Sequence, residues 1–171
     1  MHQKSKFSKG IIAVIFALSV PSLAAAATVT RILDGDTLEV TEGKTTLRVR
    51  LINIDAPEKS QPYGQRSRQF LSELVRGATD VAVKAKSNDR YGRTLADVYV
   101  KKCEPACLVY HLNSEMVKSG MAWAYRFKGT ASSMAMLELE NEARNHKLGL
   151  WRETNPVEPW RWRRSSKEAS L

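Results

Sequence analysis

The stretch VTRILDGDTLEVTEGKTTLRVRLINI, residues 29–54, contains three short apolar runs separated by two polar turns. Gly35 lies in the first turn and Gly43 in the second, and Asp-Gly between apolar runs is a strong hairpin signal. The last run, 46–54, alternates apolar side chains with Arg48 and Arg50, which is typical of a half-buried strand. The stretch therefore predicts three consecutive β-strands joined by tight turns.

The rest of the chain predicts a mixed fold. Residues 61–77 carry apolar side chains at helical spacing and end at a glycine. Residues 80–85 and 94–100 are strand-like, with a polar, glycine-containing hairpin loop between them. Two more helices are expected, over 113–120 and 132–147. Five short strands with a helix between the third and fourth fit an α+β fold of the OB type, a five-stranded, partly open Greek-key β-barrel with three helices.

Residues 1–27 have the three-part layout of a secretory signal peptide. A lysine-rich start without acids precedes the apolar run 11–20, and small residues then lead to expected cleavage near Ala27. A retained N-terminal anchor is the less favoured alternative, because a bilayer span needs roughly 20 apolar residues. We therefore expect an exported protein, in the periplasm or secreted into the medium, without membrane attachment once processed.

The remaining chain is expected to form one domain over residues 28–152, followed by a basic tail over 153–171. The formal net charge of the whole chain is +9 at pH 7, part of which lies in the lysines of the leader. A basic chain attracts polyanions, so nucleic acid and acidic surfaces are both candidate partners. The tail is interpreted as an aromatic anchor with a solvated end, and a nucleic-acid-binding arm is the alternative.

Cys103 and Cys107 are the two cysteines of the chain. A disulfide is the default in an oxidising compartment, and so short a loop is expected to fix the tip of a hairpin. A zinc site that also uses His111 is the alternative, but a structural zinc takes four ligands and no fourth ligand lies nearby in the sequence. A disulfide between the two cysteines is therefore the prediction.

Acidic side chains gather in two places. Asp34 and Asp36 flank the first glycine turn, and Asp55 and Glu58 follow the long alternating strand. If the strands that carry them pair, Asp36 and Asp55 converge, and two carboxylates that close repel unless a cation lies between them. The candidate ligands are all oxygens, which favours Ca²⁺ or Mg²⁺. Acidic turns without a metal are the alternative that the spacing leaves open.

Two arginines complete a possible hydrolytic site. Arg50 lies on the polar face of the alternating strand and Arg93 opens a later one. An arginine can grip a phosphate through two N–H groups, and arginines with a metal ion and a base are the parts of phosphodiester hydrolysis. Only His111 and His146 follow the leader, and the chain has no glycine-rich phosphate loop, so we expect a carboxylate base. A surface ion pair is the alternative for each arginine alone.

The motifs ILDGDTLEV, VRLINIDAPE, NDRYGRTLA and LGLW occur in the order and spacing of the staphylococcal (micrococcal) nuclease family, which the chain resembles from about residue 28 to 152. The resemblance implies an OB-fold barrel with three helices. It also implies a Ca²⁺-dependent endonuclease that cleaves DNA and RNA to 3′-phosphate products and prefers single-stranded or frayed substrate, expected here to be a monomer. A non-catalytic OB-fold module that only binds nucleic acid is the alternative from another class.

The resemblance assigns the acidic positions. Asp36 and Asp55 match the family's calcium-ligating aspartates, and Asp34 matches an outer acid beside the calcium. Ala56 replaces a threonine of the family prototype but keeps the backbone carbonyl that binds calcium. Glu58 matches the glutamate usually assigned as general base.

The resemblance also assigns the substrate contacts. Arg50 and Arg93 match the two phosphate-clamping arginines, and Tyr91 matches the tyrosine near the terminal phosphate of a bound nucleotide. The base-stacking tyrosine of the prototype has no secure counterpart. Tyr125 is the candidate for it, with Trp123 as the rival, and either ring can stack on an unpaired base. The CEPAC segment departs from the prototype, which lacks cysteine.

Overall fold

The computed structural model of the chain describes residues 27–168. The expected signal peptide therefore lies outside the described residues, apart from Ala27. Within 27–168, no helix combines the length and the apolar composition that a membrane span requires.

The described residues form a mixed α+β fold whose elements follow the predicted order closely. The strands are β1 (Thr28–Ile32), β2 (Thr37–Glu42), β3 (Thr45–Leu51), β4 (Ile54–Asp55), β5 (Asp80–Asn88), β6 (Thr94–Cys103), β7 (Cys107–His111), β8 (Trp123–Ala124), β9 (Arg126–Phe127) and β10 (Thr130–Ala131). The helices are α1 (Gly64–Val75), α2 (Leu112–Lys118), α3 (Met134–Asn145), the 3₁₀ turn η1 (Gly149–Arg152) and α4 (Pro159–Glu168).

The main sheet has the strand order β1-β2-β3-β6-β5, and β7 extends it by pairing with β6. The predicted meander is confirmed, because β2 pairs antiparallel with both β1 and β3. The join between β3 and β6 is parallel. No ladder of hydrogen bonds between β1 and β5 closes the sheet within the described part of the chain, so the expected barrel is not closed.

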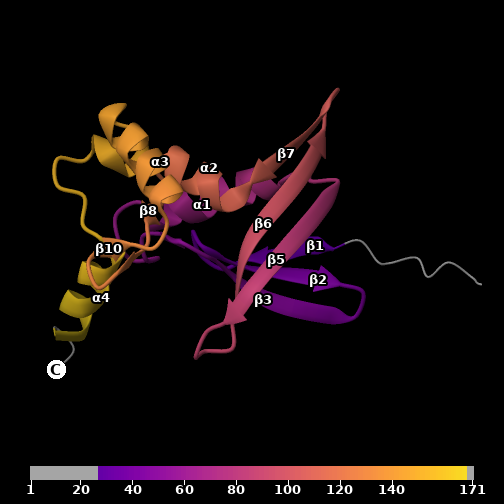
Figure 1. Ribbon diagram of the computed structural model, residues 1–171, viewed down its shortest axis with the longest axis horizontal. Helices are drawn as coiled ribbons and strands as arrows, with labels where there is room; N and C mark the ends of the chain where they lie inside the picture. The colour runs from indigo at the N-terminus through magenta and orange to yellow at the C-terminus, as the bar shows by residue number, and fades with distance from the viewer. Residues whose placement is uncertain (1–26, 169–171) are drawn as a thin grey trace, which may run out of the picture.

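Two features differ from the prediction. The expected strand 46–54 breaks after Leu51, because Asn53 adopts a left-handed backbone with φ of 65°, and the chain resumes as β4, which pairs with β8 instead. Residues 27–168 also contain four α-helices rather than three, since α4 forms within the segment expected to be a tail. Figure 1 shows α4 apart from the group of α1, α2 and α3, beyond the β9–β10 hairpin.

The main hydrophobic core joins the sheet to α1 and α2 (Figure 1). The alternation of β2 and β3 buries apolar side chains such as Leu38 and Val49, and these lie in one cluster with Leu71 of α1 and Leu112 of α2. Full burial of such a side chain stabilises the fold by about 1.5–3 kcal/mol. The core therefore fixes β2, which follows directly after the first acidic turn, and β3, which carries Arg50.

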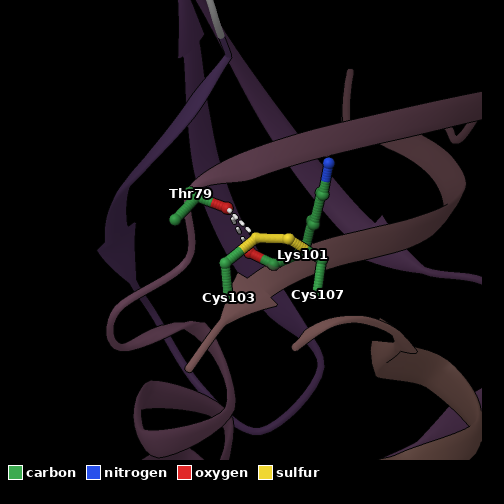
Figure 2. Close-up of a disulfide and its surroundings, with 4 residues drawn as sticks. All are labelled: Thr79, Lys101, Cys103 and Cys107. Atoms are coloured by element: carbon green, nitrogen blue, oxygen red, sulfur yellow. Dashed lines mark hydrogen bonds between the residues drawn. A yellow bond between two sulfur atoms is a disulfide. The ribbon is translucent and has the colours of Figure 1, made fainter. Parts of the chain in front are cut away.

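The predicted disulfide is present. Cys103 and Cys107 are directly opposite each other in the β6–β7 ladder, with an S–S distance of 2.11 Å. Figure 2 shows the bond beside Thr79, whose hydroxyl donates to the backbone carbonyl of Lys101 at 3.1 Å. Both sulfurs are thereby taken, so the zinc alternative is wrong. The bond lies at the tip of the β6–β7 hairpin.

Candidate active site

The first acidic turn packs directly on the second acidic segment. Asp34 Oδ1 accepts a hydrogen bond from the backbone N–H of Asp36 at 3.0 Å, which fixes the turn. A Cβ on Gly35 would lie 2.7 Å from the Cβ atoms of both Ala56 and Ser67. Only glycine therefore lets this turn reach Ala56, and the short approach brings Asp36 beside Asp55.

Asp36 and Asp55 meet through Arg50, which is the convergence that the sequence made conditional on strand pairing. Arg50 Nη1 donates to Asp36 Oδ1 at 2.6 Å and Nη2 donates to Asp55 Oδ1 at 2.8 Å. The backbone N–H of Ala56 donates to Asp36 Oδ2 at 2.8 Å. Both carboxylates are buried. One guanidinium on β3 thus bridges two buried acids, one from the turn before β2 and one from β4.

Burial and charge act in opposite directions on this pair. Burial raises the pKa of Asp36, the positive charge of Arg50 lowers it, and the charge of Asp34 raises it further; the net shift is upward. Burial lowers the pKa of Arg50, but the carboxylates of Asp36 and Asp55 outweigh it and raise that pKa. The acids therefore form an environment that favours a cation, and additional positive charge there would stabilise their ionised form.

A second arginine, Arg163 of α4, contacts Asp55 and also Glu58. Its Nη2 donates to Asp55 Oδ2 at 2.7 Å, and its Nη1 donates to Glu58 Oε1 at 2.7 Å and to Asp55 Oδ1 at 3.2 Å. Burial lowers the pKa of Arg163, and the hydrogen bonds and charges of Asp55 and Glu58 more than compensate and raise it. The sequence prediction missed this residue. The arginines of the tail were visible, but no local pattern places one of them against Asp55.

The predicted residues Arg93 and Tyr91 lie on the loop between β5 and β6. Asp89 shapes this loop: its Oδ1 accepts from the backbone N–H groups of Tyr91 and Arg93, and its Oδ2 accepts from Arg93 Nε at 2.8 Å. Burial raises the pKa of Asp89, but these hydrogen bonds outweigh it and leave the pKa below the usual value. Arg93 Nη1 and Nη2 have no hydrogen-bond or ion-pair partner within residues 27–168, so they are free to bind an anion.

An open groove of about 780 Å³ brings the predicted substrate residues together. Its lining includes the predicted site residues Arg50, Glu58, Tyr91, Arg93 and Tyr125. It also includes Trp160, Arg163, Arg164 and Lys167 of α4, none of which was predicted. Asp36 and Asp55 do not line the groove; they are buried and reach it through Arg50 and Arg163.

Tyr125 and Trp123, the two candidates for the base-stacking residue, lie in different surroundings. Tyr125 lines the groove, whereas Trp123 is 4% exposed and belongs to a second apolar cluster. The ring of Trp123 packs edge-on against Trp151 and Trp160, with centroid separations of 4.4 and 5.7 Å. Trp123 is therefore a core residue, and of the two candidates only Tyr125 can present its ring to a ligand in the groove.

The site is supported from behind by the buried carboxylate of Glu140 on α3. Glu140 Oε2 accepts from the backbone N–H of Ala124 at 2.7 Å, and its Oε1 accepts from Arg126 Nη2 and Arg144 Nε, both at 2.9 Å. Ala124 belongs to β8, which pairs with β4, the strand that carries Asp55. Glu140 thus links α3 to the floor of the groove.

The donor set suits a hard divalent cation, since carboxylate and carbonyl oxygens are the ligands that Ca²⁺ takes. Within residues 27–168, no group of three His, Cys, Asp or Glu side chains is close enough to hold a metal alone. Each carboxylate oxygen of Asp36 and Asp55 already accepts a hydrogen bond. A bound ion would therefore replace part of the arginine contacts and recruit a backbone carbonyl, such as that of Ala56, and water.

Comparison with known proteins gives a consistent result. The family model described as staphylococcal nuclease homologue matches residues 48–153. The chain is 47% identical over 161 residues to a protein of Shigella flexneri named micrococcal nuclease, covering 92% of each chain. It is 49% identical over 144 residues to protein ParB of Escherichia coli, with 81% of this chain and 78% of that one covered. It is 43% identical over 152 residues to an uncharacterized endonuclease of Escherichia coli, with 88% and 94% covered.

Proposed function

Because the chain belongs to the staphylococcal nuclease family and is a nuclease that hydrolyses phosphodiester bonds, we propose that it is an exported, Ca²⁺-dependent enzyme that cleaves DNA and RNA to 3′-phosphate products. The supporting observation is the buried pair Asp36 and Asp55, held on Arg50 beneath a groove that Glu58 and Arg93 line. We include in the proposal a partly open OB-type barrel, a monomeric state, and removal of residues 1–27 on export.

In this proposal Asp36 and Asp55 hold calcium, together with the backbone carbonyl of Ala56. The ion supplies Lewis acidity, which polarises a phosphoryl oxygen. Asp34 is proposed to act indirectly, because it accepts a hydrogen bond from the backbone N–H of Asp36 and so holds the turn in shape. Gly35 keeps that turn against Ala56.

Glu58 is the proposed general base. It lines the groove, and its carboxylate can accept the proton of an attacking water once its contact with Arg163 is exchanged. Arg50 and Arg93 lie on the same groove and are proposed to stabilise the charge that grows on the phosphoryl oxygens. Asp89 contacts the guanidinium of Arg93 only at Nε, so the side chain is positioned while its terminal nitrogens stay free.

The aromatic residues of the groove support a preference for single-stranded or frayed substrate. Tyr91 is 69% exposed and Tyr125 lines the same groove. Unpaired bases can stack on such rings for about 1–3 kcal/mol each, whereas paired bases are already stacked within the duplex. We propose Tyr125 as the base-stacking residue and Tyr91 as a contact near a terminal phosphate.

Digestion of single-stranded DNA, duplex DNA and RNA, each with calcium and with a chelator, tests the proposal. We expect cleavage only with calcium, fastest on single strands, and products that a 3′-phosphatase converts to 3′-hydroxyl ends. Cleavage that persists in chelator contradicts the calcium mechanism. Glu58→Gln serves as the matched variant, because it removes the base while keeping the shape and the hydrogen bond from Arg163. Binding without cleavage by the unaltered chain would instead favour the non-catalytic module.

A further inference from the structure

The helix α4 lies beyond the part of the chain that the family model matches, yet it lines the groove. It is docked at two points. Trp160 packs edge-on against Trp123 and lies 5.8 Å from the guanidinium carbon of Arg126, and Arg163 is paired with Asp55 and Glu58. The helix therefore belongs to the folded domain and is not a solvated tail.

The cations of α4 fall on two faces. Arg163, Arg164 and Lys167 are spaced at i, i+1 and i+4, which places them on one side of a helix, and all three line the groove. Arg161 points elsewhere: it lines a separate depression and pairs with Glu158 at 3.2 Å. Arg164 and Lys167 have no ion-pair partner within the described chain. Two positive charges thus face the groove without an acid to neutralise them.

A second part of the groove lining also carries cations. Arg90, Tyr91 and Arg93 of the loop after β5 line the groove, together with Asp89, which pairs with Arg93 through Nε. At about 780 Å³ the groove is near the upper end of the 300–1,000 Å³ of pockets that bury a drug-sized ligand, so it has room for more than one scissile phosphodiester. Cationic walls with interleaved aromatic rings are the way proteins bind single strands.

We propose that α4 forms the second wall of the nucleic-acid groove, and that Arg164 and Lys167 form a phosphate subsite for a nucleotide at a distance from the scissile bond. The proposal rests on the proposed nuclease function, because it assumes that the groove holds a polynucleotide. Trp160 keeps α4 in place, so the subsite does not depend on Arg163 remaining paired with Asp55. The ligand is the sugar–phosphate backbone of a single strand, and no base is read.

Equilibrium binding tests the subsite without relying on cleavage. Arg164→Gln and Lys167→Gln, singly and together, are made in the Glu58→Gln background so that the substrate stays intact with calcium present. The probes are a fluorescein-labelled single-stranded DNA of about eight nucleotides, within the site size of an OB fold, and a labelled dinucleotide. Arg161→Gln is the matched control, since it removes one positive charge from the same helix at a position that does not line the groove.

We expect each groove-facing substitution to weaken binding of the longer strand several-fold. The slope of log K against log salt should become shallower by about 0.7 for each phosphate that the protein no longer neutralises, hence by about 1.4 in the double variant. The dinucleotide should bind equally to all variants, because it does not reach the subsite. Arg161→Gln should leave both affinities unchanged.

Three results overturn the subsite. Equal effects of Arg161→Gln and Arg164→Gln would mean general attraction by net charge, and equal effects on short and long strands would place the contact at the scissile bond. Unchanged binding in the double variant also overturns it. Failure of the nuclease proposal would give another result. The unaltered chain would then not cleave nucleic acid with calcium, whatever the salt dependence of binding in the variants. Thermal unfolding of each variant confirms that the fold is kept.

Discussion

Substitution of Arg163 by glutamine should tighten the binding of calcium. In the structure Arg163 donates two hydrogen bonds to Asp55 and one to Glu58, so it occupies carboxylate oxygens that a calcium ion would need. Calcium must displace this contact in order to bind. Removal of the guanidinium charge frees the carboxylate oxygens for calcium. It also leaves the negative charge of Asp55 and Glu58 less neutralised, so both effects increase the affinity for calcium.

The magnitude follows from exposure and geometry. The Arg163 side chain is 40% exposed, so water screens its charge and each contact is worth no more than a surface ion pair, about 0.2–1 kcal/mol. The paired geometry on buried Asp55 lies at the upper end of that range, and the contact with half-exposed Glu58 adds little. The total is about 1 kcal/mol, which corresponds to about fivefold in the dissociation constant of calcium.

Isothermal titration of calcium into the substrate-free protein measures this directly, with the unaltered chain, Arg163→Gln and Arg161→Gln compared in one buffer. Arg161→Gln controls for net charge, because Arg161 pairs with Glu158 rather than with the site. We expect tighter binding in Arg163→Gln alone.

Calcium affinity that is unchanged or weaker in Arg163→Gln would refute the reasoning. It would mean that calcium and Arg163 do not compete for Asp55, or that Arg163 holds the acids in the arrangement that calcium needs. Equal tightening in Arg161→Gln would also refute it, since long-range charge would then explain the gain.

Three further predictions concern the frame of the site and its chemistry. Glu140→Ala leaves buried donors without their acceptor and should lower the free energy of unfolding by about 3–5 kcal/mol in urea titration. The control Glu142→Ala, at an exposed position of the same helix, should change it by less than about 0.5 kcal/mol. Similar losses in both variants would contradict the role of the buried carboxylate. Gly35→Ala forces a methyl group against Ala56 and should cost about 1–3 kcal/mol in the same assay, so unchanged stability would show that the turn can move away. Arg93→Ala should lower kcat by a factor of about 10²–10³, as loss of a transition-state donor does, and a rise in KM alone would make Arg93 a uniform binding residue.

Local sequence patterns predicted much of the fold. The glycine turns and alternating runs of 29–54 predicted the meander correctly, because strand pairing across a tight turn depends on neighbouring residues alone. The break at Asn53 was not predictable in this way. Its left-handed backbone lets β4 pair with β8, some 70 residues later, and that partner is chosen by packing.

In the candidate site, too, some features follow from the local sequence and others only from packing. The sequence made the convergence of Asp36 and Asp55 conditional on strand pairing, and the structure joins the two acids through Arg50. The choice between Tyr125 and Trp123 was not available from the sequence, since both are aromatic and only two residues apart. Burial of Trp123 against Trp151 and Trp160 decides it.

By itself, then, the sequence determined the meander of the first three strands, the disulfide and the family, because each depends on residue types at short spacings. The tertiary structure alone decided the role of the C-terminal segment. Its composition indicated an aromatic anchor with a solvated end, with a nucleic-acid-binding arm as the alternative. Only the docking of Trp160 on Trp123, more than thirty residues earlier in the chain, turns it into a helix that brings Arg163 to Asp55 and aligns Arg164 and Lys167 along the groove.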